Sequence, residues 1–331
     1  MRLASQIIVG KRLQIYTCVV RPRTSPCLDM ALPLITAIVS TYSAERFIRG
    51  CLEDLVAQTL FSEMEVLVID SGSPQGESAI CAEFARQYPQ IQLIRTEREP
   101  LYVAWNRAIP LARGKYLTNA NTDDRHRQDF MQAMVTALDQ HPEVALTYAD
   151  QLISHTENET FADCDRRGAK LRHWPDYTPQ DLMLRCITGS QPVWRKSLHA
   201  ELGDFDTRYR IAADYDMWLR FAAKYPLLKV PGPLGVLYDS PNTISGRNSR
   251  LPMNQEILDI QQRCMRQAPW QTLPGIRRRL AAELFGRGYQ HIEHDRDMQA
   301  AKPFIQEAIR LDPTNWRYLK TYALRYISGL G

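Results

Sequence analysis

No pair of cysteines in the sequence has the CxxC spacing of a zinc or redox site, and the seven cysteines are scattered along the 331 residues. An odd number of dispersed cysteines is typical of reduced thiols, so the sequence predicts a cytoplasmic protein without a structural zinc site or a disulfide framework. A run of about 18 uncharged apolar residues is also missing, which argues against a membrane-spanning helix.

An excess of charge of one sign is missing as well. Lys and Arg number 41 against 37 Asp and Glu, and a net charge of +4 over this length does not indicate nucleic-acid binding. Neither GxGxxG nor GxxxxGK[ST] occurs, so neither a dinucleotide cofactor nor a P-loop nucleotide site is indicated. Hydrophobic residues make up 44% of the chain, which is ordinary for a globular protein and enough for a full-sized core.

The composition predicts three parts. Residues 1–29 lack clear periodicity, and Lys11 and Arg12 split their apolar pieces, so we expect a poorly ordered extension rather than a signal peptide. Patterned sequence begins at Met30, which is itself a candidate start. We expect an α/β domain over residues 30–250 and a small all-α region over residues 251–331.

The α/β domain begins with alternating strand and helix signals. Strands are expected at 34–40, 65–70 and 91–95, and helices at 45–58 and 76–88. This alternation predicts an open, mostly parallel sheet with helices on both faces. Ligands of such sheets bind beyond the carboxyl ends of the strands. These ends lie near Ser40–Tyr42 and Asp70–Ser73.

A polar cluster follows the next expected strand, at 115–120. It contains Asn121, Asp123 and Asp124, and adjacent carboxylates at a strand end suit a hard cation such as Mg²⁺ or Mn²⁺. The alternative is a solvated loop in which Asp123 or Asp124 caps the helix expected at 128–140. The spacing alone leaves both interpretations open.

Five segments in order resemble family 2 glycosyltransferases with the GT-A fold. The resemblance covers about residues 33–240. The segments are ITAIVSTYSAERFIRGCLEDLVAQ (35–58), EVLVIDSGS (65–73), AWNRAIPLARGKYLTNANTDD (104–124), TGSQPVWRKSLHAELGDFD (188–206) and AADYDMWLRFA (212–222).

The resemblance implies a set of residues that bind a nucleotide-sugar donor. One of them, Asp70, would accept a hydrogen bond from the base, and another, Asp123, would be the metal ligand. Asn121 stands where the family's metal motif begins with Asp, so the expected Mn²⁺ or Mg²⁺ site is weakened. Trp105 and Ala108 also depart from the family's usual Arg and Gly beside Asn106. The implied donor-binding residues are Thr41, Tyr42, Glu45, Asp70, Asn106, Asn121 and Asp123.

The resemblance further implies that Asp214 is the general base, although Ala213 replaces the Glu that usually precedes it. A carboxylate on the acceptor side takes the hydroxyl proton during transfer. The alternative is that Asp214 and Asp216 are carboxylates favoured at a helix N-terminus by its dipole. The spacing around Trp218 predicts a core side chain rather than a ligand.

The segment around Gly189, Pro192 and Trp194 resembles the family's acceptor-side loop. Pro192 and Trp194 could line a sugar-binding surface, because aromatic faces suit the apolar faces of sugars. Equally, Trp194 could pack in the core beside the sheet.

Three further helices are expected at 253–266, 275–292 and 297–311. Residues 301–315 resemble the second helix of a tetratricopeptide repeat, with Gly286 and Tyr289 fitting the first helix. One degenerate repeat cannot form a solenoid. A homo-oligomer, and a peripheral contact with the inner face of the membrane through the basic, aromatic last helix, stay open.

We therefore expect a glycosyltransferase that moves a sugar from a nucleotide-sugar to a hydroxyl of a glycan or lipid-linked acceptor, with inversion, in polysaccharide, lipopolysaccharide or other glycoconjugate biosynthesis. The alternative is a non-catalytic protein that binds a nucleotide or a glycan through a degenerate transferase domain. Asn121 and Ala213 keep this alternative open. Turnover of a nucleotide-sugar separates the two.

Overall fold

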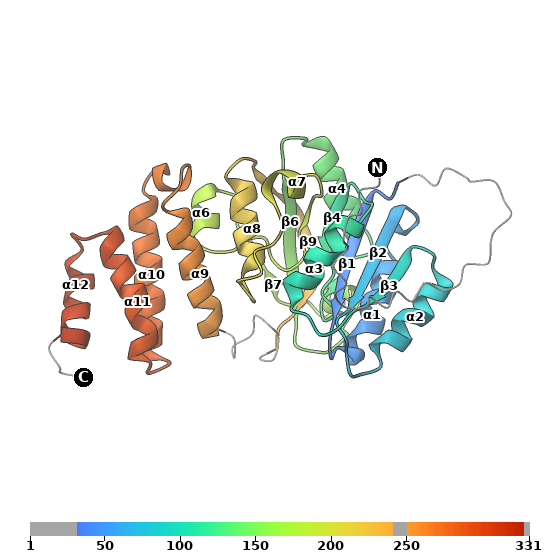
Figure 1. Cartoon of the computed structure of the whole chain (residues 1–331), viewed down its shortest axis with the longest axis horizontal. Coiled ribbons are helices and arrows are strands. Elements are labelled where there is room, and N and C mark those ends of the chain that lie inside the picture. The colour runs from blue at the N-terminus through green and yellow to red at the C-terminus, as the bar shows by residue number, and fades with distance from the viewer. Residues whose placement is uncertain (1–31, 241–249, 328–331) are drawn as a thin grey trace, which may run out of the picture.

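The computed structural model describes residues 32–240 and 250–327. The extension expected over residues 1–29 lies outside the described residues. One mixed sheet forms the centre of the described chain, with strand order β3-β2-β1-β4-β8-β6-β9-β5 and β7 paired to β6 (Figure 1). The strands are β1 (Ile35–Thr41), β2 (Met64–Asp70), β3 (Ile91–Arg95), β4 (Tyr116–Asn119), β5 (Arg125–His126), β6 (Leu146–Ser154), β7 (Leu171–Arg172), β8 (Val193–Arg195) and β9 (Leu227–Tyr238).

Helices cover the sheet and continue beyond it in a helical extension formed by residues 250–327, which is orange to red in Figure 1. They are α1 (Glu45–Val56), α2 (Glu77–Gln87), α3 (Leu101–Leu111), α4 (Phe130–Gln140), α5 (Phe161–Arg166), α6 (Pro179–Leu184), α7 (Leu198–Leu202), α8 (Ala213–Ala222), α9 (Arg250–Cys264), α10 (Ile276–Glu293), α11 (Met298–Leu311) and α12 (Trp316–Tyr322).

The expected open sheet with helices on both faces is confirmed. Strands β1 to β4 are parallel, and alternate residues of β2 enter different cores. Val66 and Val68 pack with side chains of α1, α2 and α4, whereas Leu67 and Ile69 pack in the core that contains α3 and α8. A strand buried on both faces needs a continuous apolar run, which is why these runs were readable in the sequence.

The second half of the sheet was not expected from the sequence. Strand β8 runs antiparallel between β4 and β6, and β6 pairs in parallel with β9. The register of β6 with β9 shifts at Asp150, opposite the Pro231–Pro233 segment. Prolines and a glycine inside a run demote it as a strand candidate, so the bulge conceals β9 in the sequence.

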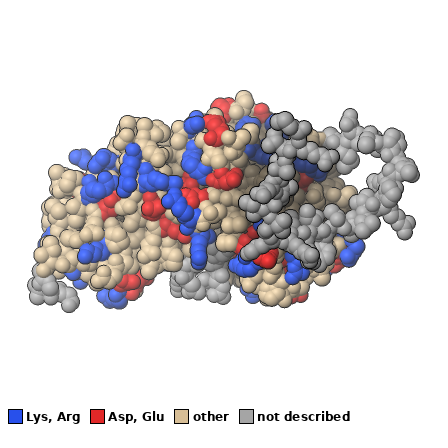
Figure 2. Space-filling model, viewed as in Figure 1, with Lys and Arg blue, Asp and Glu red and all other residues tan. Residues whose placement is uncertain are grey.

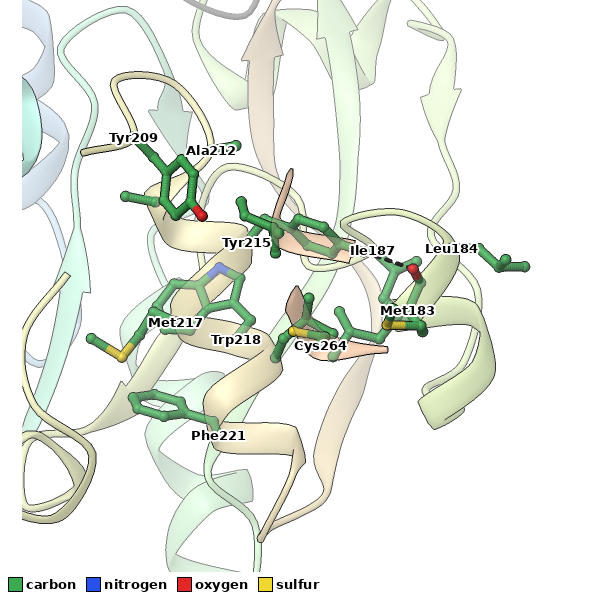
Figure 3. Close-up of a cluster of buried hydrophobic side chains, with 14 of the residues drawn as sticks. Met183, Leu184, Ile187, Tyr209, Ala212, Tyr215, Met217, Trp218, Phe221 and Cys264 are labelled. Atoms are coloured by element: carbon green, nitrogen blue, oxygen red, sulfur yellow. Dashed lines mark hydrogen bonds between the residues drawn. The ribbon is translucent and has the colours of Figure 1, made fainter. Parts of the chain in front are cut away.

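Helix α8 is the buried element that joins the sheet to the helical extension. Trp218 is 1% exposed, as expected of a core residue. Figure 3 shows α8 side chains packed in a cluster that includes Met183 and Cys264, and the hydroxyl of Tyr215 donates a hydrogen bond to the Met183 carbonyl at 2.8 Å. Gln261 of α9 donates to the same carbonyl at 2.9 Å. The apolar core therefore continues without a break from the sheet into α9.

Helices α10 and α11 pack side by side, and the apolar face of α11 expected from its spacing is buried. The tetratricopeptide-like assignment stays a prediction, because the two residues chosen for its first helix do not make the contact. Gly286 has open space around it and Tyr289 is exposed. Gly288 instead faces α11, where an added Cβ would lie 2.9 Å from Ile305.

Candidate functional site

The loops that follow β1 and β2 are bonded to each other. The Ser43 amide donates to the Ser73 hydroxyl at 3.0 Å, and the Gly76 amide donates to Oε2 of Glu45 at 3.1 Å. The Glu45 amide in turn donates to Oε1 of Gln75 at 3.3 Å. Both loops lie at the carboxyl ends of parallel strands, where ligands of such sheets bind.

Between these loops lies an open pocket. It has a volume of ≈ 580 Å³ and is lined by Ser43, Glu45, Arg46 and Gln75. The Thr41 hydroxyl at the end of β1 is buried and has no hydrogen-bond partner among the described residues. Tyr42 is 41% exposed, with the Arg98 guanidinium 3.6 Å from its ring centre. A buried hydroxyl without a partner is unusual, and a ligand at this strand end would supply one.

Asp70 is fully buried at the end of β2. One carboxylate oxygen accepts from the Ser73 amide at 2.8 Å, and the other accepts from the Ser78 hydroxyl and lies 3.7 Å from Nε of Arg95. These partners fix the turn that shapes the pocket. A base contact through Asp70 would compete with them, and its role in base recognition stays a prediction.

The segment after β4 forms a chain of polar contacts. The Asn119 amide nitrogen donates to Oδ1 of Asn121 at 3.1 Å, and the Asn121 amide nitrogen donates to Oδ2 of Asp124 at 3.1 Å. Asp123 is half-buried and forms no ion pair with a described residue. The Asp123 carboxylate is thus the one in this segment that is free to take a cation.

For Asp124 the sequence left two roles open, a cation ligand or a helix cap. It is 3% exposed, and burial together with the nearby Asp123 charge raises its pKa to about 7. Its Oδ1 accepts from the Tyr238 amide at 3.2 Å. The capping alternative is wrong for Asp123 and Asp124, because α4 begins at Phe130 with Asp129 at the N-cap position.

The expected acceptor-side loop lies against this segment. The Ser190 carbonyl accepts from the Asn119 amide nitrogen at 2.8 Å, and the Pro192 carbonyl accepts from the Thr118 hydroxyl at 2.8 Å. Gly189 has φ +67°, and an added Cβ would lie 2.8 Å from Nε1 of Trp174. Only glycine combines that backbone angle with so close a neighbour. Ser190 acts through its carbonyl and also through its hydroxyl, which accepts from the Gln151 amide nitrogen at 2.9 Å.

Trp194 does not line a sugar-binding surface. Its side chain is fully buried, with the Trp218 ring centre 5.1 Å away and an indole N–H bond of 2.9 Å to His199. The core alternative is therefore the right one for Trp194. Trp194 is buried because α8, which carries Trp218, packs against it. The residues around Trp194 in the sequence give no information about this contact.

Asn106 is engaged in structure. Its amide nitrogen donates to the Phe205 carbonyl at 2.8 Å, and the Phe205 amide donates back to its Oδ1 at 3.0 Å. This pair of bonds occupies both amide atoms and holds the turn before α8. A donor contact through the Asn106 side chain would require this pair to open.

Asp214 lies in the first turn of α8 and is half-buried. Its Oδ1 accepts from the Tyr215 amide at 2.7 Å and from the Tyr102 hydroxyl at 3.1 Å. Burial is the main cause that raises the pKa of Asp214 to about 6. A carboxylate with this pKa is ionised at pH 7 and more basic than an ordinary Asp, which suits a general base. Tyr102 looks like a core residue in the sequence.

The short loop from Cys186 to Ser190 connects the surroundings of Asp214 with the segment after β4. Cys186 lies close enough to Asp214 for the carboxylate charge to help raise the pKa of its thiol to about 12, after the larger effect of burial. Four residues further on, the Ser190 carbonyl accepts from the Asn121 amide nitrogen at 3.4 Å. The loop from Cys186 to Ser190 therefore comes near Asp214 at its first residue and is bonded to the segment after β4 at its last.

Residues 36–173 match the family described as Glycosyl transferase family 2. These residues, called the family 2 domain from here on, are similar in sequence to family 2 glycosyltransferases. The match contains the donor-side candidates from Thr41 to Asp123, and it ends before Gly189 and Asp214.

Curated relatives cover parts of the chain. It is 31% identical over 121 residues to the glycosyltransferase EpsH of Bacillus subtilis, which is 36% of this chain and 35% of that protein. It is 30% identical over 164 residues to the uncharacterized glycosyltransferase YibD of Escherichia coli K12, covering 48% of this chain and 46% of YibD. The chain thus spans less than half the length of these two relatives.

Solved glycosyltransferase structures share the fold over most of the chain. The mannosyltransferase PcManGT from Pyrobaculum calidifontis, in complex with GDP-Man and Mn²⁺, superposes with a TM-score of 0.56 at 18% identity, covering 89% of this chain and 83% of that one. Residues 1–349 of S. aureus TarS in complex with UDP-GlcNAc give a TM-score of 0.63 at 15% identity, covering 84% and 83%. The family 2 domain therefore has the expected GT-A fold.

Within residues 32–240 and 250–327, no helix is both long and apolar enough to cross a membrane.

Proposed function

We propose that the chain transfers a sugar from a nucleotide-sugar donor to an acceptor hydroxyl, with inversion at the sugar. The observation that carries the proposal is the Asp214 carboxylate, which the Tyr102 hydroxyl and the Tyr215 amide hold in the first turn of α8 and whose pKa is raised to about 6. Asp214 takes the proton of the acceptor hydroxyl as that oxygen attacks the sugar. Tyr102 holds the carboxylate through its hydroxyl.

The donor side is assigned to the pocket between the loops after β1 and β2. Thr41 offers its unpartnered hydroxyl, Tyr42 an exposed ring, and Glu45 lines the pocket. Asp70 and Asn121 complete the donor side at the ends of β2 and β4. PcManGT and TarS bind GDP-Man and UDP-GlcNAc in their complexes. We therefore propose a nucleoside-diphosphate sugar as the donor.

A divalent cation fits the residues after β4. Asp123 would hold it with an oxygen that no described residue ion-pairs, and neutral Asn121 adds no charge. Bound Mn²⁺ or Mg²⁺ supplies charge stabilisation for the leaving diphosphate. Among the described residues no three His, Cys, Asp or Glu side chains are grouped to hold a metal ion. We therefore propose that cation and donor bind together, because the diphosphate oxygens complete the ligand set.

The acceptor is proposed to be a glycan or a lipid-linked sugar. Chondroitin synthase of Escherichia coli, a polymer-forming enzyme by its name, is 23% identical over 198 residues, which is 59% of this chain and 27% of that protein. Gly189 and Pro192 stay the candidate residues on the acceptor side. Ser190, which lies between them in the chain, accepts through its carbonyl from the Asn121 amide nitrogen at 3.4 Å.

A peripheral contact with the inner face of the membrane stays a prediction, as does a homo-oligomer. Trp316 of α12 is 69% exposed, and the neighbouring Arg317 and Lys320 are exposed too. Figure 2 shows Lys and Arg side chains gathered over the helical extension. Exposed aromatic and basic side chains together suit an anionic lipid surface.

Nucleotide-sugar binding and turnover test the proposed function. The purified chain is screened by thermal shift with UDP- and GDP-sugars, with and without Mn²⁺, because a ligand of the folded state raises the melting temperature. Release of the nucleoside diphosphate is then followed with oligosaccharide acceptors. Binding together with turnover supports the transferase, whereas binding without any hydrolysis or transfer supports the non-catalytic alternative.

Replacing Asn121 by Asp is expected to tighten Mn²⁺ binding in the absence of nucleotide by about tenfold, or about 1.4 kcal/mol. A third carboxylate beside Asp123 and Asp124 raises the negative charge around a hard cation. Isothermal titration calorimetry with MnCl₂ measures the change. Thr122→Asp is the matched control, since it adds the same charge one residue away and should tighten binding less. Equal affinities in wild type and Asn121→Asp would place Asn121 outside the metal ligands.

A further inference from the structure

Helix α9, which follows the sheet in sequence, presses one charged face against the segment that leads into α8. Its Asp259 accepts from the Tyr209 hydroxyl at 2.5 Å, and its Arg263 forms an ion pair with Asp216. Glu256, Asp259 and Arg263 follow each other at helical spacing and so share one side of α9. This side lies along the segment that carries Asp214.

Glu256 binds the backbone of that segment. Its Oε1 accepts from the Arg210 amide at 2.8 Å, and its Oε2 accepts from the Ile211 and Ala212 amides at 2.9 and 2.8 Å. These three amides come immediately before α8, which begins at Ala213. Hydrogen bonds from amides to a carboxylate are stronger than those between neutral groups.

The same segment is held from its other side by α3. The Tyr102 hydroxyl donates to the Ile211 carbonyl at 2.8 Å and to Oδ1 of Asp214 at 3.1 Å. Ile211 is therefore fixed through its amide by Glu256 and through its carbonyl by Tyr102. Asp214 is three residues further along the chain, so its position depends on both contacts.

We infer that Glu256 is a positioning residue, which binds the backbone of residues 210–212 and thereby holds Asp214 in place for proton removal. The inference rests on the proposed transfer reaction. Glu256 lies on a helix more than forty residues further along the chain than the segment that it binds.

The charge of Glu256 also acts on Asp214. The groups that influence the Asp214 carboxyl from packed elements are Tyr102 of α3, Cys186 of the loop after α6 and Glu256 of α9. Burial is the main cause of the raised pKa of Asp214, and the Glu256 charge raises it further. Neutralising Glu256 should therefore lower the pKa of Asp214. A residue that stabilised the fold at a distance from Asp214 would not have this effect.

The test is Glu256→Gln in the full chain. Wild-type kcat/KM is expected to fall as the pH drops below about 6, because Asp214 must be deprotonated to act. In Glu256→Gln this acid limb moves to lower pH. Turnover at pH 7 falls by roughly 10-fold to 100-fold, since a small misplacement of a catalytic group is costly. The KM for the donor stays near the wild-type value, because the pocket after β1 and β2 is untouched.

Asp259→Asn is the matched control. It removes a carboxylate from the same face of α9 and a contact to the same segment, but it leaves the three amides bound to Glu256. The acid limb should stay at its wild-type pH in this variant. An unchanged limb in Glu256→Gln, or an equal shift in Asp259→Asn, would overturn the inference.

A second measurement separates this inference from the proposed function. The pKa of Asp214 is obtained by NMR from the pH titration of its carboxyl ¹³C signal, with Asp214→Asn used to assign the signal. If the wild-type protein transfers no sugar, the proposed function is wrong. If the pKa of Asp214 is the same in Glu256→Gln as in the wild type, the inference about Glu256 is wrong, whether or not the protein transfers sugar. If the wild-type protein is active, and Glu256→Gln lowers both the pKa of Asp214 and kcat, the proposed function and the inference about Glu256 are both supported.

Discussion

Replacing Asp214 by Asn is expected to lower sugar transfer by about 10²–10⁴-fold, the usual contribution of a general base. Asparagine keeps the size of the side chain and can still accept from the Tyr102 hydroxyl and the Tyr215 amide. It cannot take the proton of the acceptor. The fall of the wild-type rate below pH 6 should also disappear, because the group that titrates is gone.

Steady-state kinetics with a labelled donor, and calorimetry of donor binding, measure the two parts of this prediction. Donor affinity should stay nearly unchanged, because Asp214 lies outside the pocket after β1 and β2. Transfer at a near wild-type rate would mean that the base lies elsewhere. Loss of donor affinity along with the rate would make Asp214 a donor ligand or a structural residue.

Replacing Asp216 by Asn is expected to destabilise the fold by about 3 kcal/mol, while turnover changes far less than in Asp214→Asn. The Asp216 carboxylate is fully buried and pairs with Arg220 of its own helix at 3.0 Å and with Arg263 of α9. Neutralising it leaves both guanidinium groups without their buried partner. Because each is about a third exposed and can rehydrate, we expect the low end of the range for a broken buried pair.

Urea unfolding followed by circular dichroism measures this loss, which should appear as a lower midpoint with an unchanged slope. Asp216 also serves as the control for Asp214, since both lie in the first turn of α8 and carry the same charge. A midpoint equal to that of wild type would show that the pairs of Asp216 contribute nothing. A rate loss as deep as that of Asp214→Asn would defeat the distinction between the two residues.

The parallel half of the sheet could be predicted because burial on both faces leaves a continuous apolar run, as at β1 and β2. Helices α1, α2 and α4 were also expected from the sequence, and the apolar residues of α1 share one helical face. Strands β6, β8 and β9 were not, since β8 has three residues and a bulge beside Pro231 and Pro233 interrupts β9. In these strands pairing with distant neighbours outweighs local preference.

Some residues of the candidate site could likewise be predicted from the sequence, and others could not. The sheet expected from the sequence places Asp70, Asn121 and Asp123 at the carboxyl ends of two of its strands, and in the structure these are β2 and β4, which flank β1. The expected sheet could not foretell that Trp194 lies under α8, or that Asn106 holds the backbone of Phe205. Glu256 left no trace in the sequence, because its contacts are with main-chain amides. Any residue except proline can supply those amides.

The contacts of α9 with residues 210–212 mean that the proposed donor site and the proposed catalytic base depend on different parts of the chain. The candidate donor ligands all precede Asp124, within the family 2 domain, whereas the candidate base and the carboxylate that steadies it come after that domain. A shortened chain that stopped at residue 240 would lose the anchor of Asp214 and the part of the apolar core that α9 supplies. Under the proposed function, full transfer activity therefore requires the chain at least to the end of α9.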